Sequence, residues 1–170
     1  MLRTIELALS GILSAFALAI PLLFKGWLQF VIPTVGYSAT LASHVPVMIS
    51  IIAGPQVAAL TGLASTLGFL ATLGPVVAAR AATHILFGVV TALAVKRGFS
   101  FNKAIFLIAL PLHSIPEGLV VIPFGVPLYG AFINIVGGSI HHIIDAVISI
   151  IILRTAKPVL KSFRLLELKT

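Results

Sequence analysis

The chain has 170 residues, of which 59% are hydrophobic and 9% are charged, and its formal net charge is +7. Soluble domains contain roughly 45–50% apolar and roughly 25% charged residues, so this composition indicates a membrane protein and excludes a tethered water-soluble enzyme domain. The sequence has no cysteine, which excludes disulfides, thiolate metal ligands and cysteine nucleophiles.

Long apolar runs separated by glycine, proline and basic residues predict an all-α membrane protein with six transmembrane helices. In chain order the predicted spans are Ile5–Leu23, Tyr37–Ile52, Gln56–Leu73, Val76–Val95, Lys103–Ile122 and Gly130–Leu153. The first run lacks a small-residue cleavage site followed by a soluble region, so we expect a retained span and not a signal peptide. Residues 1–170 then form a single transmembrane domain.

An even number of spans places both termini on one side of the membrane, and the basic residues indicate which side. In the predicted six-span topology, nine of the basic residues lie on the same side of the membrane as the termini, whereas Lys25 and Arg80 lie on the opposite side. The nine are Arg3, Lys96, Arg97, Lys103, Arg154, Lys157, Lys161, Arg164 and Lys169. This bias predicts cytoplasmic termini and explains the net charge without a nucleic-acid partner. We expect the C-terminal run Lys157–Lys169 to lie at the lipid surface.

The connection Lys25–Thr40, between the first two predicted spans, is unusually apolar for an external loop, since it carries Trp27, Phe30, Val31 and Ile32. We expect it to fold back onto the helix bundle. Two roles fit this character: an aromatic anchor at the membrane interface, or a lid over a binding site.

Several polar residues lie inside the predicted spans, where an ionisable group costs on the order of 2.5–3.5 kcal/mol near the bilayer centre. Three pairs occur four residues apart, a spacing that places both side chains on one helix face. The pairs are Arg80 with His84, His113 with Glu117, and His141 with Asp145. His44 lies near the middle of the second span, and Asn134 lies two turns before His141.

The predicted topology gathers Arg80, His84, Glu117 and Asn134 in the outer half of the membrane, where an imported solute would first bind. No acidic residue is close to Arg80 in the sequence, and a guanidinium group suits a carboxylate. We therefore expect Arg80 and His84 to hold a ligand.

The alternative is that these polar residues only satisfy one another. The possible partners are His113 for Glu117, His141 or His142 for Asp145, and lipid headgroups for Arg80. We favour this packing role for His141, His142 and Asp145 in the last span, whereas Glu117 fits either role. Pro111 and Pro116 interrupt the backbone hydrogen bonds of the fifth span and would free carbonyls for a partner or ligand.

Other chemistries have weaker support in the sequence. Histidines and carboxylates can bind transition metals, but the motif HExxH is absent, and the adjacent His141 and His142 point about 100° apart on a helix. We therefore predict no metal site. An intramembrane hydrolase built on Ser139 and a histidine would need a positioned nucleophile and base, and no feature of the sequence indicates one.

The sequence also lacks the phosphate-binding loop GxxxxGK[ST] of an ATPase. Active transport by this chain would therefore use an ion gradient or the ATP hydrolysis of another subunit. The chain is small for an ion-coupled carrier and has no obvious pair of broken helices in matching halves, which favours borrowed ATP hydrolysis.

The first predicted span carries Gly11, Ala15 and Ala19, which form a flat strip along which another helix can approach closely. Together with His44-Val-Pro-Val-Met, Ala53-Gly54-Pro55-Gln-Val-Ala-Ala-Leu-Thr-Gly62 and the six-span layout, this strip resembles the substrate-binding S components of energy-coupling factor (ECF) transporters. The resemblance covers nearly the whole chain in layout, but its specific part is mainly residues 41–98.

The resemblance implies a multi-pass protein of a prokaryotic cell membrane that captures a vitamin from outside and has no catalytic activity and no cofactor. It would dock on one transmembrane subunit and two ATPase subunits. The strip would contact the transmembrane subunit, although position 11 is glycine where the family usually has alanine. The first external loop, with Trp27, would close the site.

The stretch Val77–His84 looks most like S components for niacin. Nicotinate would pair with Arg80 through its carboxylate, meet His84 or Asn134 at its ring nitrogen, and be covered by Trp27 or Phe30. The candidate binding residues are Arg80, His84, Glu117, Asn134, His113, His141, Trp27 and His44. Pyridoxine, hydroxymethylpyrimidine and other vitamins remain open. Two other functions also remain open. One is a metal permease or ion-coupled carrier that uses the histidines and Asp145, and the other is a scaffold with no ligand.

Overall fold

The computed structural model describes residues 4–162, with side chains up to residue 158. The predictions made for Arg3, Arg164 and Lys169, and for the side chain of Lys161, lie outside the described residues. So does most of the run Lys157–Lys169.

The described chain is mostly helical. Its first half contains α1 (Thr4–Leu23), β1 (Gln29–Ile32), the 3₁₀ helix η1 (Pro33–Val35), β2 (Tyr37–Thr40), α2 (Val45–Ser50), the 3₁₀ helix η2 (Ile51–Ala53) and α3 (Pro55–Leu73). Its second half contains α4 (Pro75–Ala81), α5 (Thr83–Lys96), α6 (Phe101–Ala104), the π-helix η3 (Ile105–Ala109), α7 (Leu110–Leu119), the 3₁₀ helix η4 (Ile122–Phe124) and α8 (Leu128–Ser162).

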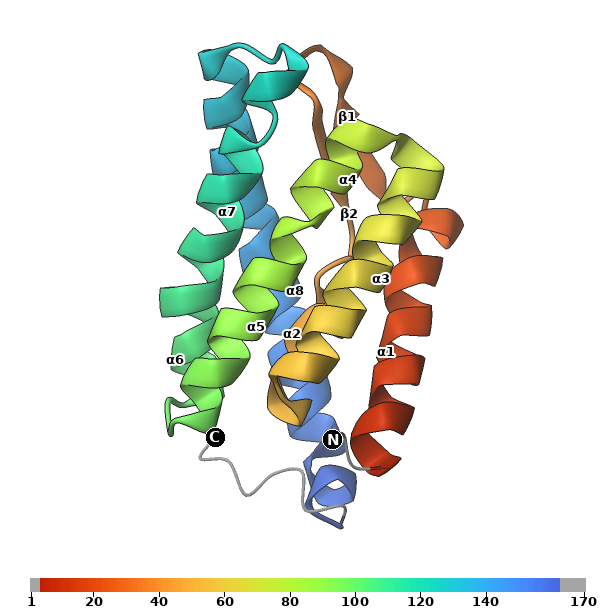
Figure 1. Ribbon diagram of the computed structural model, residues 1–170, viewed down its shortest axis with the longest axis vertical. Helices are drawn as coiled ribbons and strands as arrows, with labels where there is room; N and C mark the ends of the chain where they lie inside the picture. Colours follow the sequence, from red (N-terminus) through yellow and green to blue (C-terminus); the bar gives the residue numbers. More distant parts are fainter. Residues whose placement is uncertain (1–3, 163–170) are drawn as a thin grey trace.

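Five helical stretches of the described chain are long and apolar enough to cross a membrane. They are Thr4–Leu23, Pro55–Leu73, Pro75–Lys96, Phe101–Phe124 and Leu128–Pro158. They form one bundle, in which the start of α1 and the end of α8 lie at the same end (Figure 1). Large apolar side chains such as Leu7, Phe16 and Phe132 are exposed on its outer faces, which is unusual for a soluble monomer. The structure therefore fits the predicted class, a helical membrane protein.

The prediction that Tyr37–Ile52 is one continuous helix is wrong. Its first four residues form β2, which pairs with β1 in an antiparallel two-stranded sheet. Gly36 reverses the chain before β2 in a left-handed conformation (φ 63°), which glycine adopts without strain. This hairpin, residues 29–40, packs against α8, so the Lys25–Thr40 connection does fold back onto the bundle.

Helix α2 begins only at Val45, because the backbone turns at Ala42 (φ 63°). The backbone N–H groups of Ala42 and His44 donate to the two carboxylate oxygens of Asp145, at 2.9 and 3.0 Å. Helix α2 is buried and contacts α1, α3, α5 and α8. Residues 41–53 thus pass through the middle of the bundle from the hairpin to the opposite end (Figure 1). Their apolar character reflects burial by protein on all sides.

The predicted fourth and fifth spans exist but are irregular. The fourth is divided at Ala82 into α4 and α5. The fifth contains a π-helical turn just before Pro111, in which the N–H of Leu110 donates to the carbonyl of Ile105. Nε2 of His142, on α8, lies 3.1 Å from the same carbonyl oxygen. The carbonyl of Ile105 is therefore contacted both by its own helix and by α8.

Two glycines allow the helices to pack closely. A Cβ atom at Gly62 of α3 would lie 2.8 Å from the backbone nitrogen of Ile85 on α5. A Cβ atom at Gly118 of α7 would lie 2.6 Å from the carbonyl oxygen of Ala131 on α8. Because the opposing atoms belong to the backbone and cannot move aside, only glycine fits at both contacts.

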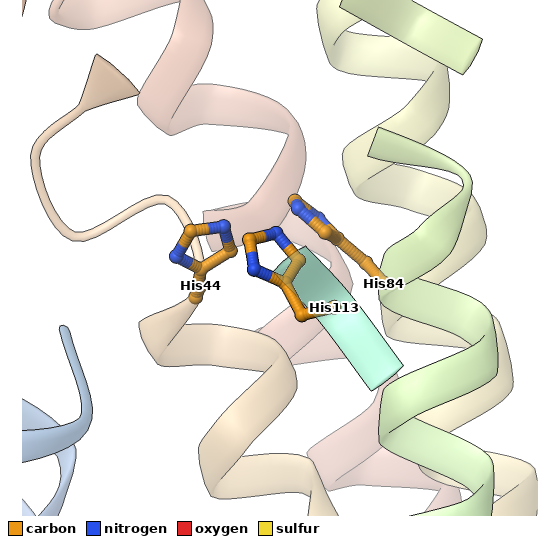
Figure 2. Close-up of side chains that lie close together, drawn as sticks. All are labelled: His44, His84 and His113. Carbon is orange, nitrogen blue, oxygen red and sulfur yellow. The ribbon is translucent and has the colours of Figure 1, made fainter. Parts of the chain in front are cut away.

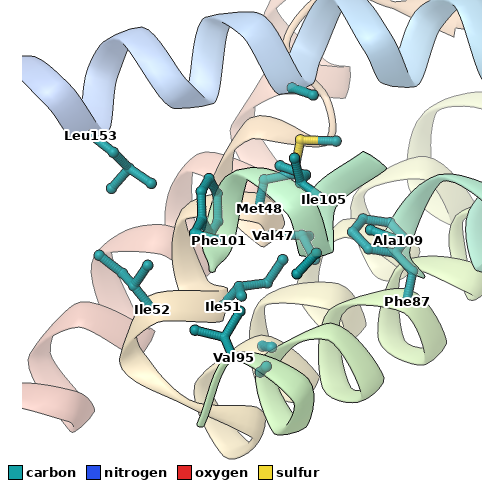
Figure 3. Packing of buried hydrophobic residues seen from close by; sticks show 14 residues of the cluster. Val47, Met48, Ile51, Ile52, Phe87, Val95, Phe101, Ile105, Ala109 and Leu153 are labelled. Atoms are coloured by element: carbon teal, nitrogen blue, oxygen red, sulfur yellow. The ribbon is translucent and has the colours of Figure 1, made fainter. Parts of the chain in front are cut away.

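The apolar core (Figure 3) is formed mainly by α2, α5, α6, η3 and α8, in the half of the bundle that lies away from the hairpin in Figure 1. Met48, Phe87 and Ile105 are among its fully buried side chains. On the same helices, buried polar residues lie nearer to the hairpin than these apolar ones. His84 precedes Phe87 by one turn, and His113 follows Ile105 by two turns. The middle of the bundle, between the core and the hairpin, is consequently polar.

Candidate functional site

Eight buried polar side chains gather between the apolar core and the hairpin, and we call them the polar cluster. They are His44, Arg80, His84, His113, Glu117, His141, His142 and Asp145. None is more than 8% exposed. All five histidines of the chain belong to the cluster, although they come from four separate segments of the sequence. Figure 2 shows three of them lying side by side.

His44 is the centre of the polar cluster. Its ring centroid lies 4.7 Å from that of His84, 4.3 Å from that of His113 and 4.4 Å from that of His141. The ring of His142 is farther away, at 5.8 Å. His44 precedes α2, the innermost helix, which is why its side chain meets residues of α5, α7 and α8 at once.

Asp145 fixes the turn that carries His44. Its carboxylate accepts the two backbone hydrogen bonds from Ala42 and His44 described above. Oδ2 also lies 3.2 Å from Nε2 of His141 and 3.0 Å from Nδ1 of His44, the latter without hydrogen-bond geometry. His141 is the partner that the sequence suggested for Asp145. The structure adds the tie to His44, about a hundred residues away in the chain.

Arg80 and Glu117 form a buried ion pair, with Nη2 of Arg80 2.5 Å from Oε1 of Glu117. The guanidinium group also donates to the carbonyl of Gly36 and to both oxygens of Ser38, at 2.9–3.2 Å. It therefore joins α4 to α7 and to the hairpin. The sequence argument considered only acidic residues near Arg80 in the chain, and so it missed this pairing.

Some buried polar atoms of the cluster lack a hydrogen-bond partner. In the described part of the chain these include both ring nitrogens of His113 and Oε2 of Glu117. Nε2 of His113 and Oε2 of Glu117 lie 3.5 Å apart. By contrast, Nδ1 of His84 lies 2.9 Å from the hydroxyl of Ser65. An unsatisfied buried polar group costs about 1–3 kcal/mol, so these atoms favour a site completed by a ligand.

A small cavity lies within the cluster. Its volume is about 20 Å³, and His44, Arg80, His84, Glu117 and His141 are among the side chains that line it. This is space for roughly one water molecule. A vitamin-sized guest would fit only if the site opened.

Asn134 is buried closer to the hairpin and does not line this cavity. Its amide nitrogen donates to the carbonyls of Val35 and Gly130, both at 2.8 Å. Ser139 donates to the carbonyl of Ile135 in its own helix. Neither side chain thus joins Arg80, His84 and Glu117, which the structure does bring together.

Trp27 lies outside the bundle, with 68% of its surface exposed. With Phe30 it lines an open apolar groove of about 700 Å³ between the hairpin and α8. The hairpin covers the cluster with Ser38 and Thr40 instead. The loop therefore lies over the cluster, but Trp27 and Phe30 do not.

The sequence analysis missed Tyr37, Gly137 and Gly138. The guanidinium of Arg80 lies 5.3 Å from the ring centre of Tyr37. A Cβ atom at Gly137 would collide with the Tyr37 ring, and one at Gly138 would collide with the carboxylate of Glu117. A glycine pair within a span was the signal that could have indicated this contact. Tyr37 lies outside the five spanning helices, and burial together with Glu117 raises the pKa of its phenol, against a smaller lowering by Arg80.

Two groups of side chains in the cluster could hold a metal ion. They are His44 with His84 and His113, and His44 with His141 and Asp145. In each group the ligand atoms lie within 4.8 Å of one another. The sequence argument against a metal considered residues of a single helix, whereas both groups combine residues from separate segments.

No family model, curated protein or solved structure matches this chain. Its functional assignment therefore depends on the geometry of the site and on the sequence features described above.

Proposed function

We propose that the chain is a substrate-capture subunit, an S component of an ECF importer, which binds a small water-soluble vitamin within the membrane. Nicotinate is the first candidate. The observation that carries this proposal is the convergence of Arg80, His84 and Glu117, from separate helices, on one buried cavity beneath the hairpin. Intramembrane ionisable residues around a cavity are typical of a binding site.

The Arg80–Glu117 pair suits a guest that carries both charges. Nicotinate has a carboxylate, which would pair with Arg80, and a ring nitrogen, which can be protonated and donate to Glu117. The guest would thus replace one buried ion pair with two charge-assisted contacts. The free Oε2 of Glu117 supports this arrangement, because it is an acceptor that lacks a donor.

The hairpin is the element whose movement would admit a guest. Arg80 ties it down through Gly36 and Ser38, and the closed cavity has room for roughly one water molecule only. A carboxylate that reaches Arg80 would compete with these hairpin carbonyls and with Glu117. We propose that the hairpin opens for entry and closes over the bound vitamin.

We also propose six crossings of the cell membrane with cytoplasmic termini. The five spanning helices and the central segment 41–53 account for six passages between the ends of the bundle (Figure 1). Helix α5 ends at Lys96, and α6, which begins at Phe101, contains Lys103. The connection between them lies at the end of the bundle opposite the hairpin (Figure 1). The positive-inside rule then directs the hairpin to the exterior.

Helix α1 offers the docking surface for a partner. It packs against α3 and buries Leu13 and Ala17, whereas Gly11 and Ala15 are exposed and Ala19 is half-buried. Gly11 and Ala15 of the strip are thus free of bundle packing. We propose that the strip contacts the ECF transmembrane subunit, with two ATPase subunits supplying the energy.

Nicotinate binding by the purified protein tests the proposed function. We expect a dissociation constant in the nanomolar range, equivalent to about −12 kcal/mol. Arg80→Ala should weaken binding by about 2–5 kcal/mol through the loss of a buried charged partner. Isothermal titration calorimetry in detergent measures both values. Arg97→Ala, at an exposed arginine, is the matched control and should bind like the wild type.

Two results of this experiment would count against the proposal. Unchanged affinity in Arg80→Ala would remove Arg80 from the site. Failure of nicotinate, pyridoxine and hydroxymethylpyrimidine alike to bind the wild type would favour the scaffold alternative, and mass spectrometry of copurifying molecules would check it.

The docking proposal has its own test, Ala15→Trp. An indole at Ala15 would hold the partner helix away from the strip, so we expect uptake with the partner subunits and ATP to fall to background while nicotinate binding is kept. Phe16→Trp, at an exposed neighbour outside the strip, should leave uptake intact. Normal uptake by Ala15→Trp would exclude this face of α1 as the contact.

The histidine-rich cluster favours a second candidate, a metal permease or ion-coupled carrier. The five buried histidines and the carboxylate offer more polar contacts than a vitamin with a single ring can use. Reconstituted liposomes separate the two functions. A permease would move its substrate with this chain alone, whereas an S component would need the partner subunits and ATP.

A further inference from the structure

Three histidines from three different elements surround one point inside the bundle. His44 precedes α2, His84 belongs to α5 and His113 belongs to α7. One ring nitrogen of each can be chosen so that all three lie within 4.8 Å of one another. Nitrogen ligands of a tetrahedral zinc ion stand about 3.3 Å apart, because Zn–N bonds are about 2.0–2.1 Å long. Small side-chain rotations would close this difference.

Two of the rings have a polar neighbour at one nitrogen, although only the contact of His84 has hydrogen-bond geometry. Nδ1 of His84 lies 2.9 Å from the hydroxyl of Ser65, and Nδ1 of His44 lies 3.0 Å from Oδ2 of Asp145. Histidines that bind metals almost always present the second nitrogen to such a carboxylate, carbonyl or hydroxyl. Nε2 of both rings is therefore the nitrogen available for a metal.

His113 is the least satisfied side chain of the three. It is fully buried, and neither of its ring nitrogens has a hydrogen-bond partner. Nε2 lies 3.5 Å from the unpartnered Oε2 of Glu117, which would orient this ring in the same way and leave Nδ1 for a ligand. Buried polar groups are normally partnered, so His113 indicates that something binds between these rings.

The charge around the three rings favours a cation. Arg80 is balanced by Glu117 in their ion pair, and the carboxylate of Asp145 remains beside His44. With the three ligand histidines uncharged, as metal ligands must be, Arg80, Glu117 and Asp145 together carry one negative charge, on the carboxylate that also contacts His141. The adjacent cavity has room for roughly one water molecule, which is the fourth ligand that a three-histidine site takes.

We propose that His44, His84 and His113 bind one divalent transition-metal ion, with Zn²⁺ and Co²⁺ as the probes. Neutral imidazole ligands without thiolate suit zinc, nickel and cobalt, and disfavour calcium and magnesium, which prefer oxygen. This proposal does not rest on the vitamin proposal, although the two share His84 and the adjacent cavity.

The test is a titration of the full chain in detergent, after treatment with a chelator, with Co²⁺ and then with competing Zn²⁺. We expect one ion per chain and the visible absorption of four-coordinate Co²⁺, which zinc abolishes. His84→Asn and His113→Asn should each weaken Zn²⁺ binding about 100-fold or more. This exceeds the effect of removing a residue that only orients a ligand. Ser65→Ala, which removes only such a partner, should weaken it about 10-fold.

His142→Asn is the matched control, because His142 contacts the carbonyl of Ile105 and belongs to neither metal group. It should keep wild-type affinity. X-ray absorption of the zinc-loaded wild type should count three imidazoles, which keeps the proposal testable if a variant fails to fold. Two or fewer imidazoles, or no bound ion, would overturn it.

His141→Asn distinguishes the two metal groups. It should keep zinc binding if the three histidines form the site. Loss of binding in His141→Asn with full binding in His84→Asn and His113→Asn would overturn the assignment in favour of His44, His141 and Asp145. Zinc binding without any vitamin binding would support this inference and reject the vitamin proposal. Vitamin binding without zinc binding would support the vitamin proposal and reject this inference.

Discussion

Glu117→Leu is expected to lower the free energy of unfolding by about 3–5 kcal/mol, the largest effect of a single substitution that we predict. Arg80 is 2% exposed, and the substitution would leave its guanidinium group in the bundle without a counter-charge. The hydrogen bonds to Gly36 and Ser38 would remain, but carbonyl dipoles do not neutralise a full charge.

The double variant Arg80→Met with Glu117→Leu distinguishes the net contribution of the ion pair to stability from the penalty of leaving one charge buried without a partner. Replacement of a whole buried ion pair by apolar residues is often neutral or stabilising. We therefore expect the double variant to recover most of the lost stability and yet to bind no nicotinate. Denaturation in mixed micelles measures the four species of the cycle. Equal stability of Glu117→Leu and the wild type would show that the charge of Arg80 is met elsewhere.

Asp145→Leu is expected to be nearly as severe, with a loss of about 3–5 kcal/mol. It would leave the backbone N–H groups of Ala42 and His44 buried without an acceptor and remove the partner of His141. The turn before α2 would lose its anchor, so zinc binding should fall as well.

Ser149→Ala is the control for Asp145→Leu, because Ser149 is also fully buried, four residues later on α8. Its hydroxyl donates to the carbonyl of Asp145, a bond within one helix whose loss should cost about 1 kcal/mol. The same denaturation assay compares the two variants. A smaller effect for Asp145→Leu than for Ser149→Ala would contradict the anchoring role of this carboxylate.

The sequence predicted most of the helical framework. Its apolar runs gave the five spanning helices to within a few residues at most ends, because apolar length is a strong signal in a membrane protein. It failed at Tyr37–Ile52, where a strand, a turn and a short helix carry an equally apolar run. Hydropathy records that a segment is buried and cannot tell whether lipid or protein buries it.

The sequence singled out all eight residues of the polar cluster but only some of their partners. The i,i+4 spacing correctly related His113 to Glu117 and His141 to Asp145. It could not relate Arg80 to Glu117, since that pair depends on how α4 packs against α7. The same limit hid the three-histidine group, whose members lie 29 to 69 residues apart along the chain.

The two-stranded hairpin limits how deep its own backbone can lie in a bilayer. Among the described residues its two strands form a sheet with no third strand, so each outer edge carries peptide groups that no neighbouring strand satisfies. Hydrocarbon cannot hydrate such groups, and open sheet edges are therefore excluded from the lipid interior. In a membrane the hairpin would therefore lie at headgroup level or against protein, and Arg80, which it covers, would lie near one face of the bilayer.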